Sequence, residues 1–179
     1  MTPQGTGRQD ASAERRPGVD RQDALALLRQ DHRDVEALFK HYKTAGEPSE
    51  KSALARRICL LLKAHARVEE EIFYPAARRR IEDKELVDEA LTEHRSIKEL
   101  IEQIEGCEAG DTMIDARLQV LSERVEMHVR EEESELFPEV QNAEIDLMGL
   151  GARLADLKQQ VMRELGAETP GRESRSFER

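Results

Sequence analysis

The sequence has few cysteines, no long apolar run and no excess of basic residues, and each lack excludes a class of protein. Two cysteines, Cys59 and Cys107, are too few for a disulfide scaffold in 179 residues. No run of about 18 apolar residues occurs, so no membrane-spanning helix is expected. Acidic residues outnumber basic ones 38 to 28, a net charge of -10. We therefore expect neither nucleic acid nor an anionic membrane as partner.

Two further absences concern targeting and strands. The first 20 residues have neither the apolar segment of a signal peptide nor the shortage of acidic residues typical of a transit peptide, so a cytoplasmic location is predicted. Hardly any stretch alternates apolar and polar residues, as a strand would. Apolar residues instead recur at steps of three and four, which indicates an all-α fold. Residues 1–20 and 167–179 are polar, with scattered Gly and Pro, and are predicted to be disordered tails.

The periodic stretches predict five helices, over residues 21–45, 49–75, 84–105, 111–138 and 144–165. Asp20 is the expected N-cap of the first, Pro75 is expected to kink or end the second, and the fourth is expected to end at Pro138. Four long helices with short connections predict an antiparallel up-down-up-down four-helix bundle over residues 21–140. The remaining stretch, residues 141–166, is predicted to be an additional C-terminal helix that packs on the bundle.

The sequence of the bundle repeats. "HARVEEEIFYP" at residues 65–75 matches "HVREEESELFP" at 128–138, and "DHRDVEALF" at 31–39 matches "EHRSIKELI" at 93–101. A helix pair is thus used twice, which predicts a site with two-fold symmetry. Each of the four helices carries one histidine in its apolar stripe: His32, His65, His94 and His128.

The HxxxE pairs predict a metal site. Four residues turn a helix by about 400°, so His65 and Glu69 project from one face, as do His128 and Glu132. Carboxylates between apolar residues are costly unless a cation compensates them. Imidazole and carboxylate without thiolate favour iron, manganese or zinc. If both glutamates bridge two metals, each metal has four protein bonds and keeps free positions.

Other polar residues near the pattern receive different interpretations. Glu70, Glu71, Glu131 and Glu133 are interpreted as solvated surface charge, although Glu70 and Glu133 stay candidates for contacts with the site. His41 lies nine residues after His32, about 180° around the helix, and is excluded. Glu36 is interpreted as a surface residue or an outer contact of the site. Tyr42 is interpreted as a core residue, with a hydrogen bond to the site as the alternative.

The histidines, the two HxxxE pairs and the segments "EEIFYP" and "ELFPEV" resemble the hemerythrin-like proteins, the HHE cation-binding domain, over residues 22–140. This resemblance implies two iron ions in a non-haem, oxo- or hydroxo-bridged centre that reacts with O2, peroxide or nitric oxide, or responds to iron. The implied ligands are His32, His65, Glu69, His94, His128 and Glu132. Oxygen carriers of the family have an HxxxH pair on the third helix, where this chain has Ala90 and Lys98 around His94. The resemblance is therefore nearer to the bacterial and iron-sensing branches than to the carriers.

Three other functions stay open at this point. The first is a reversible oxygen carrier or iron store, and the second is a metal-free helical interaction module. A hydrolase with two zinc or manganese ions is the third, and it is the least favoured because the sequence offers no separate base, nucleophile or phosphate-binding loop. Any enzymatic activity is expected to be weak and peroxidase- or catalase-like.

Overall fold

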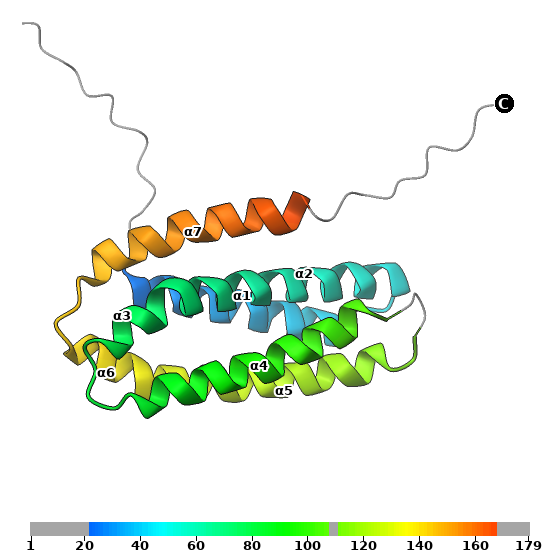
Figure 1. Cartoon of the computed structure of the whole chain (residues 1–179). Coiled ribbons are helices and arrows are strands. Elements are labelled where there is room, and N and C mark those ends of the chain that lie inside the picture. Colours follow the sequence, from blue (N-terminus) through cyan, green and yellow to red (C-terminus); the bar gives the residue numbers. More distant parts are fainter. Residues whose placement is uncertain (1–21, 108–110, 168–179) are drawn as a thin grey trace, which may run out of the picture.

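The computed structural model describes residues 22–107 and 111–167, and every regular element in them is helical (Figure 1). The elements follow one another as α1 Ala24–Thr44, α2 Pro48–Val68, the π-helix η1 Glu69–Phe73, α3 Tyr74–Arg78, α4 Glu85–Glu105, α5 Ile114–Glu131, the π-helix η2 Glu132–Leu136, α6 Phe137–Asn142 and α7 Leu147–Ala167. The predicted all-α class is confirmed. The predicted tails at 1–20 and 167–179 and the expected cap Asp20 lie outside the described residues, except for Ala167, which is the last residue of α7.

The helices form the predicted bundle with an added helix along one side. Helix α1 packs against α2, and α4 packs against α5, and each pair is joined by a short connection. In Figure 1, α7 runs along the α1–α2 side of the bundle, while α4 and α5 lie on the other side. The C-terminal helix therefore covers only one half of the molecule. Of the helices described, none has the length and apolar character needed to cross a bilayer.

Two apolar clusters make up the core, and the polar residues lie between them. In α1, Leu25 and Leu28 belong to one cluster and Val35 and Phe39 to the other, with the buried His32 in the interval. The same arrangement occurs on the other three long helices. The structure thus surrounds a polar middle layer with apolar side chains, which is the setting in which unpaired charge costs most.

The ends of the first helix follow ordinary capping chemistry. The carboxylate of Asp23 accepts a hydrogen bond from the backbone N–H of Ala26 at 2.8 Å, so Asp23 is the N-cap of α1. The backbone N–H of Ala45 bonds to the carbonyl of His41 at the other end. The fourth long helix begins at Ile114, three residues later than expected, because Asp111 first forms a turn through the N–H of Met113.

The two prolines do not end their helices. Helical structure continues past Pro75 to Arg78 and past Pro138 to Asn142, so the expected end at Pro138 was wrong. A π-helical turn lies just before each proline, and its N–H groups reach back five residues, from Tyr74 to Glu69 and from Phe137 to Glu132. This wider turn accommodates a residue that has no N–H and that clashes with the carbonyl four residues earlier. Both π-turns begin at the glutamate of an HxxxE pair.

Candidate metal centre

The four histidines turn the same ring nitrogen, Nε2, toward one point in the bundle. The Nε2 atoms of His32 and His65 are 3.1 Å apart, and those of His94 and His128 are also 3.1 Å apart. All four rings are buried. The histidines therefore form two equal pairs, one from α1 and α2 and one from α4 and α5.

Two glutamates connect these pairs. Oε2 of Glu69 lies 3.1 Å from Nε2 of His65 and 3.4 Å from Nε2 of His94. Oε2 of Glu132 lies 3.3 Å from Nε2 of His32 and 4.0 Å from Nε2 of His128. Each carboxylate thus touches one histidine of each pair, as a carboxylate between two metal ions would. The structure brings together all six residues that the sequence pattern singled out.

The two carboxylates are buried without hydrogen-bond donors. Glu69 is 0% exposed and Glu132 is 3% exposed. None of their four oxygen atoms has a hydrogen-bond partner in the described protein. Such oxygens are costly in a dry core, and a cation removes the cost. Ligand atoms of His32, His65, Glu69 and Glu132, and those of Glu69, His94 and His128, lie within 4.8 Å of one another. The site fits a pair of metal ions.

An outer layer of carboxylates fixes the orientation of the rings. The Nδ1–H of His32 donates to Glu133 at 2.7 Å, that of His94 to Glu70 at 2.9 Å, and that of His128 to Glu93 at 2.8 Å. These bonds place the proton on Nδ1 and leave the lone pair of Nε2 directed inward, the arrangement typical of metal-binding histidines.

The fourth histidine has a looser outer contact. Nδ1 of His65 lies 3.6 Å from the carboxylate of Asp31, beyond hydrogen-bond distance. Asp31 is itself bonded to Lys158 of α7. All four rings therefore face a carboxylate on the outside, but only this one is held through α7.

Comparison with known proteins shows which family has this arrangement of histidines and glutamates. The hemerythrin HHE cation binding domain matches residues 23–140 of the chain. The chain belongs to the hemerythrin HHE family. Over 127 residues it is 32% identical to a protein from Nostoc sp. (strain PCC 7120) that is named a DNA nickase. That match covers 70% of this chain and 36% of the relative, so the chain spans about a third of the length of this relative.

A solved structure has the same fold. The crystal structure of a hemerythrin HHE cation binding domain-containing protein from Mycobacterium kansasii matches with a TM-score of 0.71 at 23% identity. The match covers 84% of this chain and 95% of that one. The bundle described above is therefore the hemerythrin fold.

The outer carboxylates correct part of the sequence interpretation. Glu70 and Glu133 were expected mainly as solvated charge, but each is half-buried and bonded to a histidine. Asp31 and Glu93 were not singled out at all. A signal for them was present, because each directly precedes a histidine of the repeat, in "DH" and "EH". The repeat carries the outer contacts as well as the inner ones.

Other residues lie where the sequence analysis placed them, with one exception. His41 is exposed and pairs with Glu50, and Glu36 is exposed and pairs with Lys40. Tyr42 is buried as expected, but its hydroxyl donates to Asp115 at 2.5 Å, so the alternative of a bond to the site is wrong.

An aromatic pair distinguishes the two halves of this hemerythrin site. The buried hydroxyl of Tyr74 lies 3.2 Å from Nε2 of His94. Phe137 occupies the matching place in the second copy of the repeat, and its ring stacks on His32 with centroids 5.9 Å apart. One histidine pair thus has a hydroxyl beside it, and the other has an apolar ring.

In the metal-free protein, bound protons balance part of the negative charge of the two buried glutamates. Burial raises the pKa of Glu69 well above its usual range, and the negative charge of Glu132 adds to this. Burial lowers the pKa of His32, but contact with Glu132 outweighs it and raises the pKa to about 9. Burial lowers the pKa of His65 to about 4. A neutral glutamic acid and an imidazolium thus reduce the charge that a metal ion would otherwise balance.

Proposed function

We propose that this hemerythrin family member is a non-haem di-iron protein that reacts with or senses O2, peroxide or nitric oxide. The observation that supports it most is the pair of glutamates, buried without donors, that each touch one histidine of both pairs. His32 and His65 would hold one iron, His94 and His128 the other, and Glu69 and Glu132 would bridge them. Bound iron would supply electron transfer to and from the small ligand.

The residues around the site define the remaining roles. The outer carboxylates hold each imidazole with its lone pair inward, so the rings need no reorientation when a metal binds. Tyr74 offers a buried hydroxyl beside His94, and burial together with the nearby glutamates raises its pKa well above the usual range. It therefore keeps its proton at neutral pH and can donate a hydrogen bond. The two apolar clusters enclose the site along the length of the bundle, so water cannot reach it through the core from either end.

Reactivity, rather than reversible carriage or storage, is favoured by the ligand count. The buried residue four positions before His94 is Ala90, which offers no ligand atom, and Lys98 four positions after it pairs with Glu70. Each metal would then have four protein bonds at most, and free positions allow a small ligand to bind.

Metal analysis with an absorption spectrum of the purified protein tests the proposal. We expect about two iron atoms per chain, near-ultraviolet absorption from the bridged ferric pair, and a lower melting temperature after chelation. A colourless, metal-free protein whose melting temperature is unchanged by added iron would support the interaction-module alternative. Two zinc or manganese ions with phosphoester hydrolysis would support the hydrolase.

Reactivity is tested separately, by reducing the iron-loaded protein anaerobically, admitting air and then removing the oxygen under vacuum. We expect conversion to the oxidised spectrum without return, followed by slow peroxide consumption. Return of the reduced spectrum over many cycles would identify a carrier.

The name of the Nostoc relative suggests DNA as an alternative substrate, and the charge of this chain opposes it. A net charge of -10 repels a polyanion, and the match covers only 36% of the relative. We expect no conversion of supercoiled plasmid to the nicked circle by the metal-loaded protein. Nicking that is lost in a Glu69→Ala variant would overturn this expectation.

A further inference from the structure

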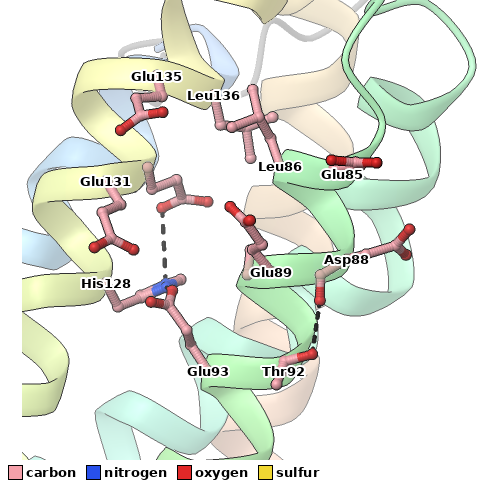
Figure 2. Close-up of a pocket in the computed structure, with 12 residues that line it drawn as sticks. Glu85, Leu86, Asp88, Glu89, Thr92, Glu93, His128, Glu131, Glu135 and Leu136 are labelled. Atoms are coloured by element: carbon pink, nitrogen blue, oxygen red, sulfur yellow. Dashed lines mark hydrogen bonds and ion pairs between the residues drawn. The ribbon is translucent and has the colours of Figure 1, made fainter.

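An acidic groove leads from the surface between α4 and η2 to the candidate metal centre (Figure 2). Its volume is about 690 Å³. Figure 2 shows the carboxylate of Glu89 on α4 directed at the space between the helices, with Glu131 and Glu135 on the facing helix. Glu85, at the start of α4, belongs to the same lining. His128 and Glu132, two of the candidate ligands, belong to the same lining. The groove therefore connects solvent with the site.

Besides His128 and Glu132, the lining of the groove contains six acidic side chains and no lysine or arginine. Asp88 is neutralised by Arg78, and Glu93 is bonded to His128. Glu85, Glu89 and Glu135 form no ion pair with any residue in the described ranges. The groove thus holds uncompensated negative charge along its rim, a potential that concentrates cations.

The equivalent face of the other half is covered by α7. The pocket of about 550 Å³ that remains there, between α1 and α7, includes Lys158 and Arg163 and none of the six candidate ligands. Glu89, Glu131 and Glu135 correspond to Leu27, Val68 and Ile72 in the first copy of the repeat. These three belong to an apolar cluster that includes Leu150 and Leu154 of α7, which contacts α1, α2 and η1. Of two equivalent faces, one is apolar and covered, and the other is acidic and open.

The floor of the groove points to a cation as its occupant. Glu132 is buried, both of its carboxylate oxygens lack a donor, and it lines the groove. Its Oε2 lies 4.0 Å from Nε2 of His128, which lines the groove beside it. A path of carboxylates that ends at an unpaired buried carboxylate offers oxygen ligands of the kind preferred by hard divalent ions at each step.

We infer that this groove is the route by which a divalent cation, ferrous iron in the proposed function, reaches the centre. Glu85, Glu89 and Glu135 at the rim collect the ion, and Glu131 passes it inward to Glu132. The inference rests on the proposed metal-binding function. A second groove, between α1 and α5, also leads to the site at His32, but it is less suited to a cation. Its four basic residues, Arg33, Lys40, Lys43 and Arg130, outnumber its three glutamates, and two of these, Glu36 and Glu133, already pair with Lys40 and His32.

The rate of metal uptake tests the route without reference to activity. Metal-free protein is mixed with Co²⁺ in a stopped-flow instrument, and the visible absorption of the bound ion is followed. The rim variant Glu85→Gln/Glu89→Gln/Glu135→Gln should lose about tenfold or more of the second-order rate constant at low ionic strength. The difference should shrink as salt shortens the Debye length. Both proteins should still bind two ions at equilibrium.

A matched variant controls for overall charge. Glu47→Gln/Glu99→Gln/Glu123→Gln removes the same charge from exposed residues that line neither the acidic groove nor the groove between α1 and α5. Its rate should stay within about twofold of the wild type, since charges far from the groove contribute little to the potential at its rim, and added salt reduces that contribution further. Equal slowing of both variants, or of neither, would overturn the route while leaving the metal site intact. Absence of uptake by the wild type would overturn the proposed function itself.

Discussion

The two halves of this hemerythrin share a polar interior and differ in almost everything outside it. In each half one histidine follows an acid, "DH" or "EH", and the other begins an HxxxEE sequence. Around this shared set, the first half places apolar residues under α7, and the second half places carboxylates beside an open groove. In the proposed function, a pair of metal ions needs ligands in equal sets, and this constrains the interior. The exterior is not constrained in this way, so one side can stabilise the fold while the other, by our inference, admits the cation.

The largest expected effect is the loss of metal affinity when either of the two symmetry-related glutamates of the interior is replaced. Glu69→Gln and Glu132→Gln each remove a bridging charge, so each should lower metal affinity by more than the roughly 10- to 100-fold typical of outer contacts. Metal content after dialysis measures this. His41→Ala, on an exposed residue, should keep the full content. Full retention of iron by the variant with both glutamates replaced would show that the metal is elsewhere.

The contribution of α7 to stability is tested by shortening one of its buried side chains. Leu154 is 0% exposed in the cluster that joins α7 to α1 and η1, so Leu154→Ala should lower the free energy of unfolding by about 2–5 kcal/mol. Urea titration measures the change. Met148 is 48% exposed on the same helix, and Met148→Ala should change stability by about 0.5 kcal/mol or less. Similar values for both variants would mean that α7 does not stabilise the first half.

The outer carboxylates of the two halves also differ in how closely they contact their histidines. Glu93→Gln removes the negative charge of the acceptor that lies 2.8 Å from Nδ1 of His128 and should lower metal affinity about 10- to 100-fold. Asp31→Asn should have a smaller effect on affinity, because its contact with His65 is longer, at 3.6 Å. Competition with a chelator measures both. The reverse order would show that the tie to Lys158 makes Asp31 the more important positioning residue.

The sequence predicts the bundle and the inner six residues well, because both follow from short-range periodicity and from a repeat. It predicts the outer contacts poorly. Glu70 and Glu71 are neighbours in a run of glutamates, yet only Glu70 reaches a histidine, since helical position and the bundle geometry decide which one faces inward. The π-turns were also missed. They arise where a proline and a required ligand orientation meet, and neither propensity nor periodicity signals that coincidence.

The smallest expected effect concerns Tyr42, whose hydroxyl does not contact the candidate metal centre. Its hydroxyl and the ammonium of Lys51 donate to Asp115 and lower the pKa of that carboxylate. Such a group stabilises the fold above its unfolded pKa of about 3.9, and the contribution is lost as pH falls through the lower folded value. Tyr42→Phe should therefore destabilise by at most about 1 kcal/mol near neutral pH, because Asp115 is 58% exposed and solvent screens the contact.

The difference between Tyr42→Phe and wild type should shrink in acid. Asp115 also raises the pKa of Tyr42, together with burial, so the contact is lost again when the hydroxyl ionises in strong base. Urea titrations at several pH values give the profile, and metal content should not change, since the hydroxyl bonds to Asp115 and not to a candidate ligand. A loss of bound iron in this variant would mean that the apolar end of the bundle and the metal layer are coupled more tightly than their separate contacts indicate.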